Sequence, residues 1–195
     1  MIQLLPFLLF AFVASITPGP TNLLAMSSSA RFGLRATLPI VFCGCLASAG
    51  VVLAVGLGIG KILLSMPIVA QLLGWIGALW LSYLGWQITQ APSTIDATTK
   101  GERPLSGWAT ALMQLINPKP WTVALAVVSV FVTSTGAPAW LLALLFLLIA
   151  VPCMLLWAWL GLKAGRWIQT GIKLQRFNQV MGLLLAISGW LSLLS

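Results

Sequence analysis

The chain has 195 residues, of which 60% are hydrophobic and only 6% are charged. Soluble domains carry about a quarter charged residues, so this composition and a mean hydropathy of +1.06 exclude an ordinary soluble fold. Ten Lys and Arg stand against two acids, and there is no histidine. The basic residues are scattered at the ends of apolar segments, which is typical of membrane loops and argues against nucleic acid as a partner.

Apolar length predicts six membrane-spanning helices. They lie near 3–28, 37–60, 67–90, 108–132, 138–161 and 176–194. We expect a single polytopic domain over 1–195, with one repeat of three helices at about 1–90 and another at about 108–195. Residues 91–107 form a polar loop between them that contains both acids, Asp96 and Glu102. A repeat of three helices ends on the opposite side of the membrane from where it began, so the second repeat starts from that opposite side. The sequence therefore predicts an all-α membrane protein of two inverted three-helix repeats, with the first and fourth helices broken by proline motifs.

The basic residues predict how the chain is oriented in the membrane. The second predicted loop has Lys61 and the fourth has none, whereas the first, third and fifth together carry Arg31, Arg35, Lys100, Arg103, Lys163, Arg166, Lys173 and Arg176. Positive charge collects on cytoplasmic loops, so these three loops are expected in the cytoplasm and both termini in the periplasm. Ser27, Ser28 and Ser29 precede the first loop, and we interpret them as a polar helix end rather than the lining of a vestibule.

Two of the predicted helices are interrupted by prolines at matching positions. "SITPGPTNLL" in the first helix holds Pro18 and Pro20, and "LINPKPWTVA" in the fourth holds Pro118 and Pro120, an offset of 100. Proline has no N–H and clashes with the carbonyl four residues back. The carbonyls expected to lose their partners are those of Ala14, Ile16, Gln114 and Ile116. One such motif would be interpreted equally well as a kink, but the pairing favours a functional role.

A helix restart is expected at each break. Thr17 and Asn117 are suitable N-cap residues, and each precedes a proline, which favours the first helical position. The restarted helices run in opposite directions and would both present their positive N-terminal ends to the membrane centre. Two such ends together predict an anion-binding site.

Lys119 lies inside the second break. At about 1.5 Å per residue it is roughly 18 Å along the helix from Gly107, near mid-bilayer. A lysine at that depth costs about 2.5 kcal/mol or more. No predicted span contains a carboxylate, so Lys119 must be neutral, snorkel, bond to freed carbonyls, or bind an anion from outside the protein. We favour a cycle between the last two states.

The motifs at these positions resemble those of the LysE/RhtB family of bacterial amino-acid exporters. The family's Pro-Gly-Pro is seen as Pro18-Gly19-Pro20, and its Asn-Pro-Lys as Asn117-Pro118-Lys119. "GALWLSYLGW" is similar to the family's third helix and "SSSARFGLRA" to its first basic loop, so the resemblance covers essentially the whole chain. The size and start of the chain are similar to the cysteine/O-acetylserine exporter branch. The resemblance implies proton-driven export of amino acids across the bacterial inner membrane, without enzymatic activity or a cofactor.

The residues themselves predict the class of substrate. Lys119 and the helix N-termini suit a carboxylate, while freed carbonyls and the amides of Asn22, Gln114 and Asn117 could accept bonds from an α-ammonium. A second positive charge would find no counter-ion, which favours small zwitterionic amino acids such as cysteine, O-acetylserine, homoserine or threonine. Lys119 could also carry the coupled proton, because a desolvated lysine can exchange its proton. The candidate substrate-binding residues are Thr17, Pro18, Gly19, Pro20, Asn22, Gln114, Asn117, Pro118, Lys119 and Pro120.

Three other classes of protein are alternatives to an amino-acid exporter. A divalent-cation exporter of related architecture is the main alternative, although hard cations prefer anionic oxygens and Lys119 would repel them. A thiol–disulfide electron carrier would need cysteines beside the breaks, whereas Cys43, Cys45 and Cys153 lie in the second and fifth spans. A membrane enzyme would need His, Asp or Glu in the spans. Besides its substrate, the expected partner is the lipid bilayer, and small-x-x-x-small patterns at 56–60 and 161–165 leave a homodimer open.

Overall fold

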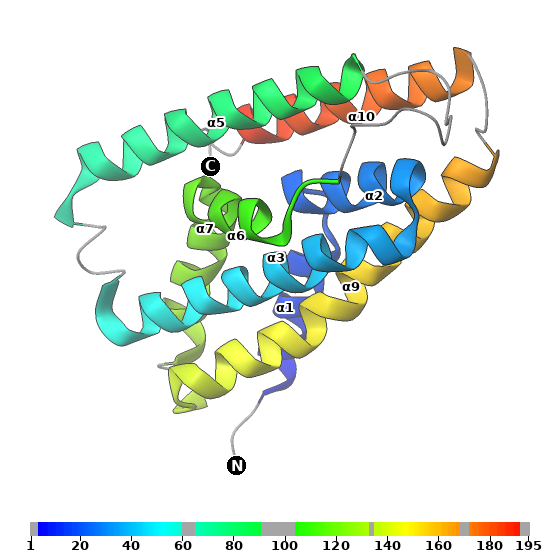
Figure 1. Cartoon of the computed structure of the whole chain (residues 1–195). Helices are drawn as coiled ribbons and strands as arrows, with labels where there is room; N and C mark the ends of the chain where they lie inside the picture. Colours follow the sequence, from blue (N-terminus) through cyan, green and yellow to red (C-terminus); the bar gives the residue numbers. More distant parts are fainter. Residues whose placement is uncertain (1–3, 60–64, 91–103, 133–134, 168–171, 192–195) are drawn as a thin grey trace.

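A computed structural model describes residues 4–59, 65–90, 104–132, 135–167 and 172–191, and these form helices and no strand (Figure 1). The elements in chain order are α1 (Leu5–Ile16), α2 (Pro20–Phe32), α3 (Leu34–Ala54), η1 (Val55–Ile59), α5 (Pro67–Thr89), α6 (Gly107–Ile116), α7 (Pro118–Ala126), η2 (Val127–Val132), α9 (Ala139–Trp167) and α10 (Ile172–Leu191). The loop predicted at 91–107, with Asp96 and Glu102, lies largely outside the described residues.

Two stretches, Leu34–Ile59 and Ala139–Gly165, are long and apolar enough to cross a membrane. Two bent pairs meet the same criterion if each is counted as one span, so the described residues hold between two and four candidate spans. The third and sixth predicted spans correspond to α5 and α10, which are helices but are not among the stretches that pass. An all-helical membrane fold is therefore confirmed, whereas six spans in two inverted repeats remain a prediction.

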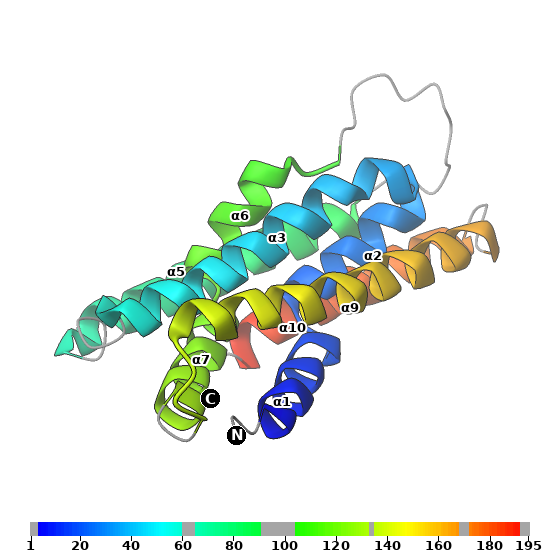
Figure 2. The same cartoon turned by 90° about the horizontal axis from the view of Figure 1, so that it is seen from below.

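Both predicted helix breaks are present. The first bends by 52° between Leu5–Ile16 and Pro20–Phe32, and the second by 64° between Gly107–Ile116 and Pro118–Val132. In Figure 2, α1 and α7 lie below the ribbons of α3 and α9, whereas α6 lies above both of them and α2 lies between them. The chain therefore passes the two breaks in opposite directions, as an inverted repeat requires.

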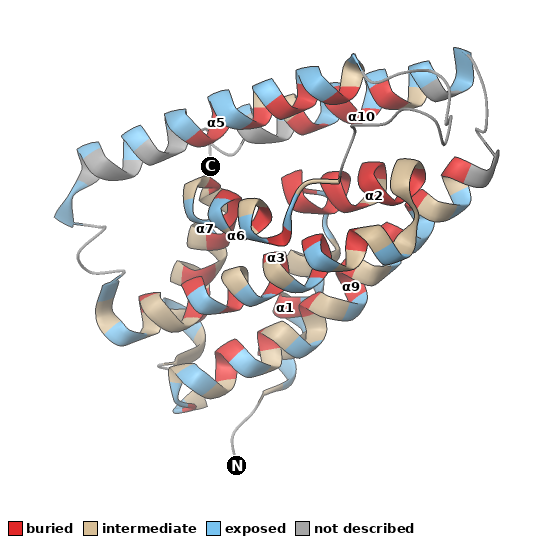
Figure 3. Cartoon of the chain, in the orientation of Figure 1, coloured by how far each residue is buried: buried red, intermediate tan, exposed pale blue. Residues whose placement is uncertain are grey.

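The interior is formed by apolar side chains from nearly every helix, and Figure 3 shows the buried residues on the sides of the helices that face one another. The largest side chains with almost no exposure are those of Phe7, Ile40, Leu81, Met113, Leu142 and Leu185. Lipid is as apolar as leucine, so helices in a membrane are held together by close packing rather than by burial from water.

Glycines provide that close packing between two pairs of helices. A Cβ on Gly161 of α9 would lie 2.1 Å from the Met26 carbonyl oxygen of α2, and one on Gly165 would lie 2.4 Å from that of Ala30. Gly85 of α5 and Gly182 of α10 meet each other's carbonyl oxygens in the same way, at 2.4 and 2.2 Å. The 161–165 pattern is therefore used inside one chain, where it brings the backbones of α2 and α9 together.

Replacing Gly161 with alanine is expected to destabilise the α2–α9 pair. The new methyl group would meet backbone rather than a flexible side chain, so we expect a loss of about 1–3 kcal/mol. Gly50→Ala is the matched control, because a Cβ there meets nothing within 4 Å and alanine favours helix by about 0.5–1 kcal/mol. Thermal unfolding in detergent measures both, and equal melting temperatures for the two variants would contradict the packing described.

Candidate functional site

The first break is an extended segment between α1 and α2. α1 ends at Ile16, and the Thr17 hydroxyl donates a 2.6 Å hydrogen bond back to the Val13 carbonyl of α1. The N-cap position of α2 is occupied by Gly19, which has no side chain to cap with. The prediction of Thr17 as an N-cap is therefore wrong, because its hydroxyl is engaged with the helix that ends rather than the helix that begins.

Side chains supply donors to the carbonyls at the first break. The Asn22 amide donates to the Ser15 and Thr17 carbonyl oxygens, both at 3.0 Å. The Trp157 indole of α9 donates to the Ile16 carbonyl oxygen at 3.1 Å. The interrupted backbone is thus held in place by donors from α2 and α9, which avoids the cost of unpaired carbonyls.

At the second break only Asn117 separates α6 from α7, and its role agrees with the predicted N-cap. The Asn117 side-chain oxygen accepts a 3.1 Å hydrogen bond from the Lys119 backbone N–H, so Asn117 is confirmed as an N-cap and α7 begins at Pro118. The Trp121 indole donates to the Leu115 carbonyl oxygen at 2.9 Å. Gly77 of α5 packs against the Ile116 carbonyl, which a Cβ on Gly77 would approach to 2.1 Å.

Lys119 connects the two breaks. Its Nζ donates a 2.9 Å hydrogen bond to the Thr17 carbonyl oxygen, 102 positions earlier in the chain. A Cβ on Gly19 would lie 2.8 Å from that Nζ and 3.1 Å from Lys119 Cδ, so glycine makes room for the lysine. Of the four states expected for Lys119, the structure shows the one in which the lysine bonds to a backbone carbonyl. The acceptor is the carbonyl of Thr17, and not the carbonyl of Ala14 or Ile16, which the prolines were predicted to free.

A small cavity of about 60 Å³ lies where the breaks meet. Seven of the ten candidate residues line it, and Thr17, Pro18 and Pro118 do not. The seven are Gly19, Pro20, Asn22, Gln114, Asn117, Lys119 and Pro120. The N-terminal residues of α2 and α7 therefore face one shared space.

Nine further lining residues were missed by the sequence argument: Ala14, Ser15, Thr21, Cys45, Ser48, Val123, Phe146, Ala150 and Met154. Ser15 and Thr21 lie within the first proline motif and could have been included on position alone. The residues of α3 and α9 carry no local signal, because only the packing of these helices brings them to the cavity.

Polar atoms at this cavity are left available for a ligand. Within the described structure, Ser15 Oγ and Gln114 Oε1 are buried and have no hydrogen-bond partner. The Gln114 Nε2 donates to Thr21 Oγ1 at 2.9 Å, which leaves its oxygen as a free acceptor. Leaving such atoms unsatisfied costs about 1–3 kcal/mol each, so a bound polar group would be stabilised here.

The site thus combines one ammonium group, two helix N-termini, hydroxyl and amide oxygens, and an apolar wall. Interrupted helices that meet at a cavity define a class of membrane transport proteins which bind a small solute between helix halves.

Comparison with known proteins agrees with this class. The model of the LysE type translocator family matches residues 12–194, and the chain belongs to that family. A cysteine/O-acetylserine efflux protein of Klebsiella pneumoniae subsp. pneumoniae is 32% identical over 173 residues, 80% of each chain. Proteins of the same name from Shigella flexneri serotype 5b and Escherichia coli strain K12 are 31% and 30% identical, covering 73% of this chain and 75% and 72% of theirs. No solved structure matches.

Asn117→Ala is expected to weaken the second break. Loss of an N-cap side chain costs about 0.5–2 kcal/mol, and the Lys119 N–H would lose its acceptor. Thr17→Ala is the control, because the Thr17 hydroxyl caps no restart and should change stability much less. Unfolding in detergent micelles compares the two, and a Thr17 variant as destabilised as the Asn117 variant would contradict the asymmetry between the breaks.

Proposed function

We propose that this chain exports small zwitterionic amino acids or their derivatives, such as O-acetylserine, cysteine, homoserine or threonine, from the cytoplasm across the bacterial inner membrane. Membership of the LysE type translocator family and the names of the relatives support amino-acid efflux. The observation that carries the choice of a carboxylate is the Lys119 ammonium. It bonds a backbone carbonyl across the two breaks, and the described cavity lining contains no acid.

Binding would proceed by an exchange of partners at Lys119. A carboxylate forms a stronger, charge-assisted hydrogen bond with an ammonium than a neutral carbonyl does, so it would draw Nζ away from the Thr17 oxygen. The N-termini of α2 and α7 would add to the attraction for negative charge.

The α-ammonium of the same molecule would then replace the lysine at the Thr17 carbonyl. Gln114 Oε1 and Ser15 Oγ, which are buried and unpartnered in the described structure, offer further acceptors. Carboxylate and ammonium are adjacent in an amino acid, so one small zwitterion can make both exchanges at once. A dicationic amino acid would bring a second charge with no acidic partner in any predicted span.

Lys119 would also be the residue that carries the coupled proton. The predicted spans contain neither acid nor histidine, so a carboxylate or imidazole relay is unavailable there. Lys119 would bind the carboxylate while it is an ammonium and would exchange its proton after the substrate has left. In this proposal the basic loops lie in the cytoplasm and both termini in the periplasm.

Lys119→Met is expected to reduce efflux of labelled O-acetylserine from proteoliposomes by at least about tenfold, because the anchoring charge is lost. Lys163→Met is the control, since Lys163 is exposed, lies over the Trp159 ring and does not line the cavity. Normal export by the Lys119 variant would show that both the anchor and the proton-carrier roles are wrong.

A panel of amino acids tested with and without a pH gradient checks the substrate class. We expect efflux of O-acetylserine and threonine that rises with the gradient, and little efflux of lysine or arginine, because their second charge is uncompensated. A preference for lysine would contradict the zwitterion argument, and export insensitive to the gradient would contradict proton coupling.

A further inference from the structure

A second and larger cavity, of about 570 Å³, lies between α2, the C-terminal end of α5 and the segment that leads into α6. Its volume falls in the range of small-molecule sites, roughly 300–1,000 Å³. The polar residues that line it are Ser27, Ser28, Arg31, Gln87, Gln90 and Ser106. The remaining wall is apolar, so the cavity has the mixed character of a ligand-binding site.

α2 forms a wall of both cavities. Thr21 and Asn22 of α2 line the cavity at the breaks, and Leu24, three residues after Thr21, already belongs to the second cavity. Three residues of helix rise about 4.5 Å, so the two spaces follow each other along α2. The hydrogen bond from Gln114 Nε2 to Thr21 Oγ1 joins α6 to α2 beside the first of these cavities.

Three serines near the end of α2 are buried. Ser27, Ser28 and Ser29 are 2%, 6% and 1% exposed, so this polar helix end is buried. Ser27 and Ser28 line the second cavity, as the lining of a vestibule would, whereas Ser29 does not. The Thr37 hydroxyl of α3 donates a 3.0 Å hydrogen bond to Ser28 Oγ, which leaves the Ser28 hydroxyl proton for another acceptor.

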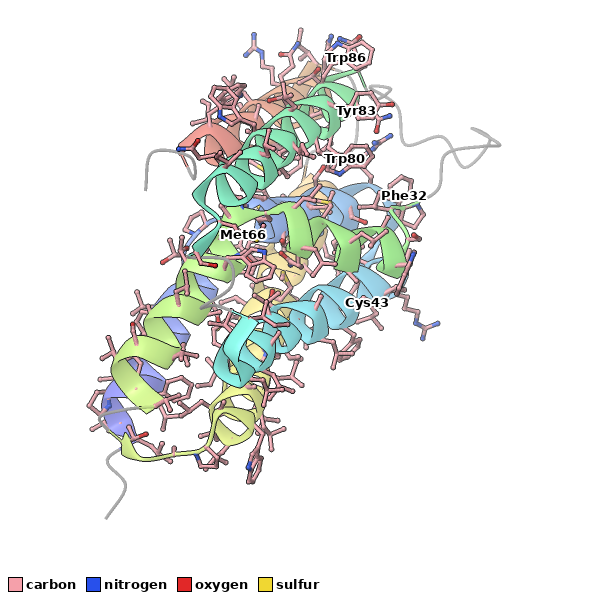
Figure 4. The ribbon with its side chains drawn as sticks, turned by 90° about the vertical axis from the view of Figure 1, so that its left-hand side faces the viewer. Phe32, Cys43, Met66, Trp80, Tyr83 and Trp86 are labelled. Carbon is pink, nitrogen blue, oxygen red and sulfur yellow. The ribbon has the colours of Figure 1, made fainter. Side chains whose placement is uncertain are left out.

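Arg31 is the cationic residue of the described lining. Its guanidinium lies 5.1 Å from the centre of the Phe32 ring, a contact that holds the charge at the cavity. Figure 4 shows Phe32 at the edge of the molecule that also carries Trp80, Tyr83 and Trp86 of α5, and Phe32 and Trp86 both line the cavity. A guanidinium presents a planar set of donors that matches the two oxygens of a carboxylate.

We propose that this cavity is an entry site, in which Arg31 and the serine hydroxyls receive the carboxylate of the amino acid before it moves along α2 to Lys119. This inference rests on the proposed export function and adds a second binding site to it. The basic loop beside Arg31 is predicted to be cytoplasmic, so the entry site is on the side from which an exporter takes its cargo.

The first test measures access to the cavity by cysteine labelling. Ser27→Cys, reconstituted in phosphatidylcholine vesicles, is treated with a membrane-impermeant anionic thiosulfonate, and the wild-type chain gives the background from the native cysteines. We expect rapid labelling that O-acetylserine and threonine slow, and that threoninol, which lacks the carboxylate, does not. Ser29→Cys, two residues away and outside the lining, should react much more slowly.

Two outcomes of this test would overturn the entry site. One is equal labelling of the two cysteine variants, or equal protection by threonine and threoninol. The other is protection by phosphatidylglycerol vesicles alone with none from the amino acids, which would assign the cavity to an anionic lipid headgroup.

The second test compares two arginines on either side of Gly33, Arg31 in α2 and Arg35 in α3. Arg31→Gln is expected to raise the half-saturating O-acetylserine concentration for efflux by about tenfold with little change in maximal rate. Arg35→Gln removes the same charge from an exposed residue outside the cavity and should leave that concentration unchanged. Wild-type export with identical behaviour of both variants would overturn the entry site alone. A wild-type chain that moves no amino acid would overturn the proposed function and the entry role with it.

Discussion

The hydrogen bond from Lys119 to the Thr17 carbonyl is the contact around which the rest of the structure is arranged. A lysine within apolar segments needs a partner, and the chain places its two acids elsewhere, at Asp96 and Glu102. The partner is therefore a backbone oxygen, and backbone oxygens become available only where a helix is interrupted. The break between α1 and α2 thus supplies the acceptor for the lysine at the break between α6 and α7.

Each interruption in turn depends on donors from neighbouring helices. Two tryptophans, Trp157 and Trp121, donate their indole N–H groups to carbonyls beside the first and second breaks, and Asn22 donates to two more. An indole combines a large apolar ring with a single donor, so it can pack in an apolar interior and still satisfy one oxygen. The breaks are consequently ordered features, and they leave a small cavity between the helices.

Much of this arrangement could be predicted from local sequence, because proline and asparagine act on the backbone within a few residues. The positions of both breaks, the Asn117 cap and a bond from Lys119 to a backbone carbonyl follow from such local rules. The failure at Thr17 has the opposite cause. Its hydroxyl can either accept a hydrogen bond from a backbone N–H of the next helix or donate one to a carbonyl of the preceding helix, and the outcome depends on where α2 restarts. Ser48, Phe146 and Met154 could not be found, because α3 and α9 contribute to the cavity only through tertiary packing. The burial of Ser27 and Ser28 was missed for the same reason.

The glycine contacts between α2 and α9 have a mechanical consequence. Gly161 and Gly165 let the two backbones touch over a full turn, so α2 cannot slide or tilt against α9 without a clash of main-chain atoms. Because α2 lines both cavities, one side of each cavity is held against α9. The second cavity has α5 on its other side, and α5 packs chiefly on α10 and only lightly on α6 and α7. A rigid-body shift of α5 together with α10 would therefore widen the second cavity at the smallest loss of packing, while the contact between α2 and α9 stayed in place.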